Sequence, residues 1–378
     1  MKQGWYSESI EDLCEVEYGT RVVRKRDAGT IYLVYGGGGA TFSMDTYNRE
    51  DRMVIARFAM SKRCVRFVDG KFFLNDSGLT ISPLDDNTFD QDFLNYQILS
   101  LNDEIYSLAR GTAQKNLNVN AFKKVQLSYP ASLEEQKQIV AKLDQCFEAI
   151  DKARANAAKN LENAKELFQS KLNEIFSQKG EGWVEVVLNE IGETQTGTTP
   201  PTKDISNYGD YIPFVKPPHF SPDGSINTGS SMLSKSGLEK GRLFQSNSVL
   251  MVCIGATIGK TGFSTVPVSS NQQINCLTPK KEYNPKLFYY GLISPFVQRQ
   301  VIEIGSGSQA TLPIINKSKW SKLRINIPTE RSVQDVIVQL LDGLKQKTQP
   351  LESKYQQELN SLEELKKSIL QKAFEGEL

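Results

Sequence analysis

Two stretches of the chain carry apolar residues at alternating steps of three and four positions, with polar residues between them. This spacing places the apolar side chains along one face of a helix and is typical of helices that pair lengthwise. In the first stretch the face consists of Val140, Leu143, Phe147, Ile150, Ala157, Leu161, Ala164 and Phe168, with Arg154 as its one charged member. In the second it consists of Ile337, Leu341, Leu344, Leu351, Tyr355, Leu362, Leu365 and Ile369. We therefore predict long helices over 132–180 and 330–378.

The sequence also marks where these helices start and where the second is weakened. Ser132-Leu-Glu-Glu135 has the spacing of a capping box, in which the serine accepts from the first turn and the glutamate reaches back. Pro350 lacks the N–H that a continuous helix needs, which predicts a kink or a break. From Ser132 to Phe176 the first helix is about 68 Å long. A compact domain cannot cover that length, so we expect an antiparallel coiled coil rather than two separate surface helices.

The segments before each helix, 1–131 and 181–329, have a different pattern. They are rich in Gly, Pro and Asn, and they contain short β-branched or aromatic runs such as Phe72-Phe73-Leu74, Val249–Ile254 and Leu323–Ile327. Such runs between turn residues are typical of strands. We predict an α+β fold with two mixed domains, 1–131 and 181–329, each followed by a long helix.

The two halves repeat one another. Short residue groups recur in the same order and at similar spacing, which indicates a duplicated unit with pseudo-twofold symmetry. The matched pairs are Gly4-Trp5 with Gly182-Trp183, Gly19-Thr20 with Gly197-Thr198, Asn75 and Pro83 with Asn271 and Pro279, Gly111-Thr112 with Gly307-Ser308, and Gln136 and Asp144 with Gln334 and Asp342.

Composition narrows the class of protein. The net charge is only +1, but 21–68 holds ten Lys and Arg against four Asp and Glu, and 181–328 holds fourteen against ten. A basic stretch is more often a solvated face than a nucleic-acid site, so the charge counts only beside other signals. The five cysteines are scattered and there is one histidine, which argues against zinc and disulfides. The N-terminus lacks the apolar core of a signal peptide and the longest apolar run, Val249–Ile254, is too short to cross a bilayer; we expect a cytoplasmic, metal-free protein.

Three fragments resemble catalytic motifs but lack a residue that the chemistry needs. Gly255-Ala-Thr-Ile-Gly259-Lys260-Thr261 has three residues between its glycines where a P-loop has four, which favours a strand-to-turn connection. Gly305-Ser-Gly307-Ser-Gln-Ala310 has no βαβ unit or acidic partner to make it a dinucleotide fingerprint. Lys216-Pro-Pro-His219 lacks the polar and aromatic residues that an amino-methyltransferase places around Pro-Pro. We expect no catalytic, cofactor-binding or metal residues.

A four-glycine run, Gly36 to Gly39, leaves two possibilities open. It permits close backbone approach, so it could contact DNA or form a turn.

Several segments resemble the specificity subunits of Type I restriction-modification systems. Pro130-Ala-Ser-Leu-Glu-Glu-Gln-Lys-Gln-Ile-Val140 is similar to the start of that family's central helix, and 365–378 is similar to its C-terminus. Thr196–Pro200 through Tyr211–Phe214 is similar to the start of many of its target recognition domains, and Val34–Gly39 and Phe72–Ser77 fit another variant. The second helix departs from the pattern, because it begins Thr329-Glu-Arg-Ser-Val and contains Pro350.

The resemblance implies a non-catalytic subunit that reads DNA. Each target recognition domain would read one half of a split double-stranded DNA target, and the helices would set the distance between halves. Two methyltransferase subunits would dock on the helices and use S-adenosylmethionine to methylate adenine by base flipping. A translocase-nuclease (R) subunit using ATP and Mg would join for restriction, and no membrane is involved.

Charge and loop position select the candidate DNA-binding residues, since lysine and arginine hold phosphates and polar loop residues read bases. They are Arg21, Arg24, Lys25, Arg26, Arg57, Lys62 and Arg63 in the first domain, and Thr198, Thr199, Lys203, Lys216 and Lys260 in the second. Three alternatives stay open: a related bipartite system whose nuclease is fused to its methyltransferase, a coiled-coil interaction scaffold, and a freestanding methyltransferase or nuclease.

Overall fold

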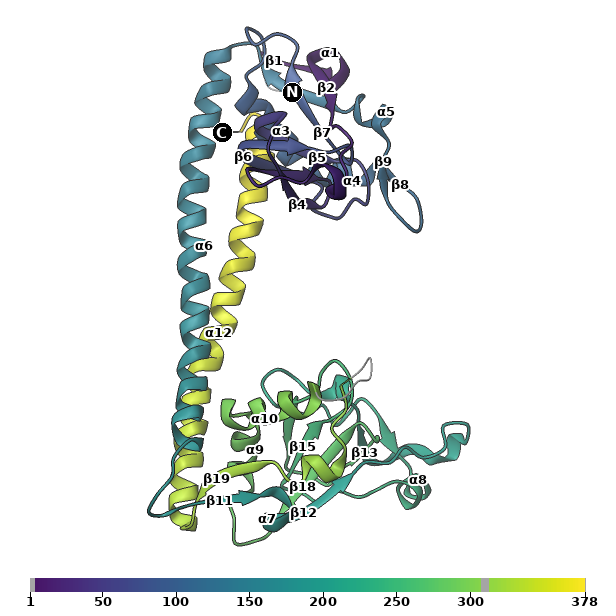
Figure 1. Ribbon diagram of the computed structural model, residues 1–378, viewed down its shortest axis with the longest axis vertical. Helices are drawn as coiled ribbons and strands as arrows, with labels where there is room; N and C mark the ends of the chain where they lie inside the picture. Colours follow the sequence, from purple (N-terminus) through teal and green to yellow (C-terminus); the bar gives the residue numbers. More distant parts are fainter. Residues whose placement is uncertain (1–3, 307–312, 378) are drawn as a thin grey trace. The chain divides into compact units, whose positions relative to one another are not determined.

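The computed structural model describes residues 4–306 and 313–377 and falls into two compact units. Unit 1 comprises 1–157 and 357–378, and unit 2 comprises 158–356 (Figure 1). Each unit contains one mixed domain together with part of helix α6 (Leu133–Phe176) and part of helix α12 (Arg331–Phe374). The two long helices predicted from the apolar spacing are therefore present. Part of the predicted repeat, Gly307-Ser308, and most of the discarded fingerprint lie outside the described residues.

The mixed domain of unit 1 is built on a six-stranded sheet in the order β2-β7-β5-β6-β3-β4, in which β3 runs parallel to β6. Strands β1 and β10 form a separate pair. The elements in chain order are β1 (Trp5–Ser9), α1 (Ile10–Leu13), β2 (Cys14–Tyr18), α2 (Arg24–Asp27), β3 (Tyr32–Gly36), β4 (Gly39–Met44), β5 (Arg49–Ala56), β6 (Val65–Leu74), β7 (Gly78–Pro83), α3 (Gln91–Ser100), α4 (Asn102–Ser107), β8 (Ala109–Arg110), β9 (Asn116–Leu117), α5 (Val119–Phe122) and β10 (Gln126–Pro130).

The mixed domain of unit 2 has a four-stranded sheet, β12-β18-β15-β16, a three-stranded sheet, β14-β13-β17, and the pair β11-β19. Its elements are β11 (Trp183–Val187), α7 (Leu188–Ile191), β12 (Gly192–Thr196), η1 (Ile205–Asn207), β13 (Tyr208–Val215), η2 (Pro217–His219), β14 (Met232–Leu233), α8 (Lys235–Lys240), β15 (Ser248–Val252), β16 (Thr261–Ser264), β17 (Ser269–Ser270), β18 (Ile274–Pro279), α9 (Pro285–Ile293), α10 (Pro295–Ser306), α11 (Lys317–Trp320) and β19 (Arg324–Pro328). Both domains are mixed, as predicted.

Matching strand registers confirm the duplication. Trp5 lies opposite Pro130 in the pair β1–β10, and Trp183 lies opposite Pro328 in β11–β19. Likewise β2 pairs with β7 in unit 1 as β12 pairs with β18 in unit 2. Strands β7 and β18 each end on a proline, which lies opposite the first residue of β2 or β12. The repeated glycine, tryptophan and proline residues therefore mark the same positions in both copies.

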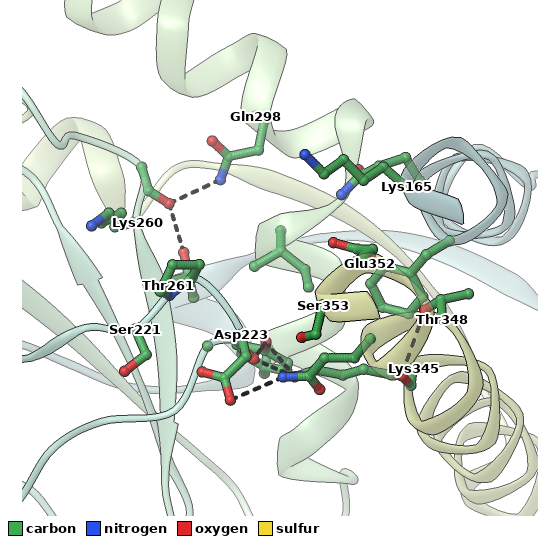
Figure 2. A pocket seen from close by; sticks show the side chains of 18 residues that line it. Lys165, Ser221, Asp223, Lys260, Thr261, Gln298, Lys345, Thr348, Glu352 and Ser353 are labelled. Carbon is green, nitrogen blue, oxygen red and sulfur yellow. Dashed lines mark hydrogen bonds between the residues drawn. The ribbon is translucent and has the colours of Figure 1, made fainter. Parts of the chain in front are cut away.

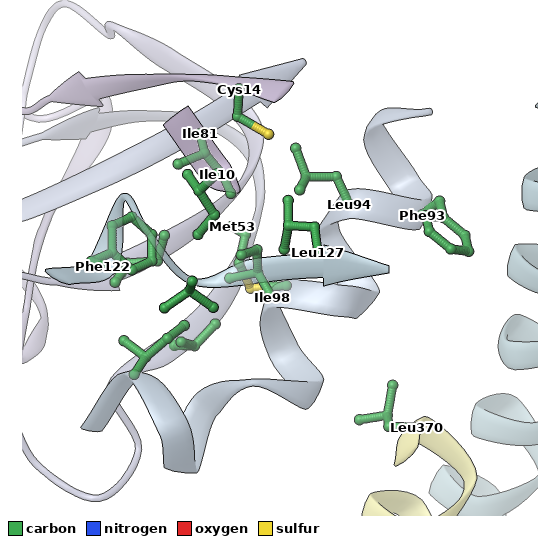
Figure 3. Packing of buried hydrophobic residues seen from close by; sticks show 14 of the residues in the cluster. Ile10, Cys14, Met53, Ile81, Phe93, Leu94, Ile98, Phe122, Leu127 and Leu370 are labelled. Carbon is green, nitrogen blue, oxygen red and sulfur yellow. The ribbon is translucent and has the colours of Figure 1, made fainter. Parts of the chain in front are cut away.

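In both units the core continues from the mixed domain onto the long helices. In unit 1, Ile10, Met53, Ile98 and Leu127 pack inside the domain, and Leu370 of α12 belongs to the same cluster (Figure 3). In unit 2, the core includes Phe168, Leu172, Ile175 and Phe176 of α6 and Ile337, Val338 and Leu341 of α12. Burial of each such side chain contributes roughly 1.5–3 kcal/mol. The helices are thus held by the domains as well as by each other.

The core contacts also establish the antiparallel pairing. The first turns of α6, with Leu143 and Phe147, share a cluster with Leu370 and Ala373 near the end of α12. In unit 2 the end of α6 shares a core cluster with the start of α12. Ion pairs Asp151–Lys366 (3.4 Å) and Arg154–Glu363 (3.1 Å) join the two helices. The charge of Arg154, the one charged member of the first apolar face, is therefore paired.

The predicted apolar face of α12 is more exposed to solvent than the spacing indicates. Leu351 and Leu365 are 42% and 46% exposed, whereas Leu341 is fully buried. Of the kink or break predicted at Pro350, the break is wrong, because α12 runs through it as one helix; the kink stays a prediction. Pro350 is exposed, so water can reach the carbonyl group that loses its helical hydrogen bond. At the start of α6 the serine half of the capping box is present, with Glu135 N–H donating to Ser132 Oγ (3.4 Å), while the Glu135 carboxylate accepts from Trp5 Nε1 (3.4 Å).

A buried glutamine joins each long helix to its own domain. The Gln136 side chain is fully buried; its Oε1 accepts from the N–H of Asp90 (2.8 Å) and its Nε2 donates to the carbonyl of Pro130 (3.0 Å). Gln334 repeats both bonds with Asn284 (2.9 Å) and Pro328 (2.9 Å). We call these two sets of contacts the glutamine clasps. Each fixes the start of a long helix against the last strand of its domain and against the N-cap residue of a domain helix.

Replacing Gln334 with leucine should lower the free energy of unfolding of unit 2 by about 2–3 kcal/mol, because two buried main-chain groups lose their partners. Gln339→Leu on the exposed face of the same helix should change it by less than about 0.5 kcal/mol. Urea unfolding followed by circular dichroism measures both. Equal stability of the two variants would show that the clasp contributes nothing.

Candidate nucleic-acid interface

Three segments of unit 2 meet where β12, β13 and β17 end. The N–H of Thr198, after β12, donates to the carbonyl of Ser270 (2.9 Å), and the N–H of Asn271 donates to the carbonyl of Val215, the last residue of β13 (3.2 Å). The hydroxyl of Thr199 donates to Gln272 Oε1 (2.6 Å). We call this group, 197–199 with Lys216, Cys253 and 271–273, loop platform 2.

Unit 1 builds the same arrangement. The N–H of Thr20 donates to the carbonyl of Leu74 (2.9 Å), and the N–H of Asn75 donates to the carbonyl of Tyr35 (2.9 Å). A further main-chain bond repeats as well. The N–H of Arg57 donates to the carbonyl of Ser77 (2.8 Å), and the N–H of Cys253 donates to the carbonyl of Gln273 (2.7 Å). We call 19–21 with Gly36, Arg57 and 75–77 loop platform 1.

The glycine that opens each platform is required by close backbone approach. A Cβ on Gly19 would lie 1.9 Å from the carbonyl oxygen of Asn75, and a Cβ on Gly197 would lie 2.2 Å from that of Asn271. No real side chain tolerates these distances. The repeated glycine and asparagine found in the sequence therefore define the backbone of both platforms.

The same backbone presents different side chains in the two units. Gly36 occupies the place of Lys216, Ser77 that of Gln273, and Arg57 that of Cys253, as the shared main-chain bonds show. Lysine, glutamine and arginine are side chains that hold phosphates or read base edges. Two equivalent frames with different polar groups are suited to recognising two different sequences.

In unit 1 the structure places Arg57 on platform 1. Its guanidinium donates to the carbonyl of Asp76 (3.4 Å) and lies over the rings of Tyr18 (5.0 Å) and Phe58 (4.6 Å), so it is half-buried and held in place. Arg21 follows Thr20 directly. Both predicted residues therefore belong to segments of platform 1.

The remaining predicted residues of unit 1 lie on two other exposed segments. Arg24, Lys25 and Arg26 form α2, where Arg26 pairs with Asp27 (2.7 Å). Lys62 and Arg63 lie on a loop beside α4 and α12, and Arg63 is 3.7 Å from Glu363. The run Gly36–Gly39 forms the β3–β4 turn, with Gly36 opposite Gly39, so the turn interpretation is confirmed.

In unit 2 the structure brings Thr198, Thr199 and Lys216 together on platform 2 and leaves Lys203 exposed on the following loop. Lys260 is not on the platform. It lies in the turn between β15 and β16, whose Gly259 and Lys260 N–H groups already donate to Val252 (2.9 Å) and Thr257 (3.2 Å). The strand-to-turn interpretation of this P-loop-like fragment is therefore correct.

The loop histidine is a structural group in this setting. His219 Nδ1 accepts from the N–H of Lys216 (3.3 Å), and burial together with the Lys216 charge lowers the pKa of His219. It therefore closes the turn that carries Lys216.

Sequence reasoning missed the residues at the centre of platform 2. Asn271, Gln272 and Gln273 form its turn, and Arg242 donates to the carbonyl of Thr196 beside it (2.7 Å). The matched Asn75 and Asn271 were the available signal, because an asparagine at equal positions of both copies indicates a shared turn. Arg242 had no such signal.

Two broader features of the described residues bear on function. Within 4–306 and 313–377, no group of three His, Cys, Asp or Glu side chains could hold a metal ion. Over the same residues, no helix is both long and apolar enough to cross a membrane. Burial raises the pKa of the Cys14, Cys253 and Cys276 thiols to about 12, so these cysteines are unreactive packing residues.

Residues 2–160 and 180–361 match the family model described as the Type I restriction modification DNA specificity domain, so each half of the chain matches it once. The chain belongs to this family of DNA specificity proteins.

Individual relatives agree with this assignment. The HindI type I restriction enzyme specificity subunit of Haemophilus influenzae is 30% identical over 154 residues, which is 40% of this chain and 33% of that subunit. The chain thus matches about a third of that subunit's length. A putative type I specificity subunit of Mycoplasma genitalium is 21% identical over 98% of this chain and 94% of its own.

Solved structures share the fold. One chain, from a study of complex assembly and conformational transition of the type I R-M system, has a TM-score of 0.72 at 19% identity, covering 100% of this chain and 99% of that one. The HsdS subunit of Thermoanaerobacter tengcongensis has a TM-score of 0.51 at 20% identity, covering 100% and 98%.

Proposed function

We propose that this chain is the specificity subunit of a Type I restriction-modification complex and that each loop platform reads one half of a two-part DNA target. The repeated platforms carry this proposal, since one backbone frame presents Arg57 in one copy and Lys216 and Gln273 in the other. The antiparallel helices α6 and α12 would then set the distance between the two half-sites.

We further propose that the chain leaves the chemistry to its partners. Two methyltransferase subunits would supply S-adenosylmethionine and flip the target adenine, and a translocase-nuclease subunit would supply the ATP- and Mg-dependent step. Three sequence fragments resemble catalytic motifs, but each lacks a residue that the chemistry needs, and this supports the proposal that the partners supply the catalysis. The complex would act in the cytoplasm, on chromosomal or incoming duplex DNA.

Salt dependence of DNA binding tests the platforms. We expect the chain to bind a duplex containing its target weakly alone and tightly with its methyltransferase subunit. Lys216→Met should reduce the slope of log K against log salt by about 0.9, the value for one lost phosphate contact. Lys235→Met, an exposed lysine of α8 outside the platform, is the matched control and should leave the slope unchanged.

Base reading is tested separately by Gln273→Leu, which removes polar groups without changing charge. The salt slope should stay the same, while discrimination against altered bases in one half-site should fall by about 1–3 kcal/mol per base pair. A chain with no salt-dependent duplex affinity, alone or with its partner, would overturn the proposed function and favour an interaction scaffold.

A further inference from the structure

A cleft of about 610 Å³ lies inside unit 2, away from loop platform 2 (Figure 2). Its walls come from α6, α12, the loop 221–224 and the turn 259–261. Small-ligand sites in proteins are of similar size, about 300–1,000 Å³.

Three lysines line this cleft, each from a different element. Lys165 belongs to α6, Lys260 to the β15–β16 turn and Lys345 to α12 (Figure 2). Within residues 4–306 and 313–377, none of the three amines forms an ion pair with a carboxylate. Surface lysines often lack partners, but three on the walls of one cleft concentrate positive charge there.

Lys345 is held in place inside the cleft. Its half-buried amine donates to the carbonyl of Asp223 (2.5 Å) and to the hydroxyl of Tyr289 (3.1 Å), which leaves one of its three N–H donors for another acceptor. Burial lowers its pKa, and the nearby Asp223 and Asp342 carboxylates offset this only in part. The amine is therefore held in position with one donor left for a ligand.

The carboxylates of the cleft offset the charge of the lysines only in part. The Asp223 side chain already accepts from the Ser225 hydroxyl (2.6 Å) and from Gln349 Nε2 (3.2 Å). Glu352 is the other acidic group on the wall, so the cleft carries three positive groups against two negative ones. The cleft therefore keeps an excess of positive charge, which favours an anionic ligand.

We propose that this cleft binds a ligand that carries phosphate, whose negative oxygens would be attracted by the lysines of its walls, Lys165, Lys260 and Lys345. Lysine binds phosphate as a point charge, so amines from three elements can attract such a ligand without the planar geometry that arginine imposes. The site differs from a P-loop, because the N–H groups of Gly259 and Lys260 are already used within their turn. The phosphate could belong to duplex DNA or to a small polyphosphate ligand; the duplex source rests on the proposed function.

The first experiment uses inorganic pyrophosphate as the probe, titrated calorimetrically into the full chain at constant ionic strength. Lys165→Met should weaken binding at least tenfold, and so should Lys345→Met. Lys159→Met and Lys347→Met remove exposed lysines of the same two helices outside the cleft and should bind within twofold of the parent. Lys165 is exposed and makes no described hydrogen bond, so its replacement tests binding without endangering the fold.

The second experiment measures the salt slope of duplex binding for the same four variants in the chain–methyltransferase complex. A slope reduced by about 0.9 in Lys165→Met, with the controls unchanged, identifies a DNA phosphate as the ligand. Loss of pyrophosphate binding with an unchanged slope identifies a small phosphate ligand instead. If neither pyrophosphate affinity nor slope distinguishes the cleft variants from the controls, the phosphate site is wrong. A parent complex that binds no duplex refutes the proposed function, while the pyrophosphate result still decides the cleft.

Discussion

Exchanging residues 181–329 for the corresponding domain of another specificity subunit should change one half of the methylated DNA target and leave the other half intact. The reason is that platform 2 lies wholly within this segment and platform 1 wholly outside it. The exchange should keep Trp183 and Pro328, whose pairing joins the domain's first and last strands next to α12. Co-expression with the methyltransferase subunit followed by genome-wide mapping of methylated adenines gives the result directly.

The reciprocal exchange of 1–131 is the control and should alter the opposite half of the target. A methylated motif that stays the same after either exchange would contradict the two-reader proposal. A motif in which both halves change would show that the two domains read DNA jointly.

Removing one heptad from both long helices should shorten the spacer between the half-sites by about 3 base pairs. Seven helical residues span about 10.5 Å, and one base pair of duplex spans about 3.4 Å. The ion pairs Asp151–Lys366 and Arg154–Glu363 fix the register of the helices, and continuing it places 155–161 opposite 356–362. Deleting both segments keeps those ion pairs and, of the residues packed on the unit 1 core, removes Leu362. Methylation mapping reads the spacer length.

Deleting 155–161 alone is the matched control. It puts the two helices out of register, so we expect loss of stability and of methylation rather than a new spacer. If the paired deletion is folded and active with the original spacer, the helices do not set the distance between half-sites.

The helices and the duplication could be predicted because both leave regular marks in the sequence. Alternation of three and four positions reports a buried helical face whatever it packs against, and Leu143 and Leu341 are indeed fully buried. Gly19 and Gly197, which open the repeated Gly-Thr pairs, mark backbone positions where a side chain cannot fit, so both copies have glycine there.

The errors arose where tertiary surroundings decide the outcome. A proline on the exposed face of a long paired helix removes one helical hydrogen bond, and water can bond to the freed carbonyl group. Pro350 is therefore tolerated and causes no break. Sequence position likewise cannot tell which basic residues share a surface. Arg57 and Arg63 are close in the chain, yet one lies on platform 1 and the other beside α12. Only the folded path of the loops separates them.

The close approach at Gly19 and Gly197 has a consequence for how new specificities can arise. Because main-chain bonds hold each platform, an exposed side chain such as Gln272 adds only its bond with the Thr199 hydroxyl and can be exchanged at a small cost in stability. Under the proposed function, single substitutions at such positions would therefore change the DNA target, provided that the glycines stay. Sequence preference and folding would then depend on separate residues of the same loop.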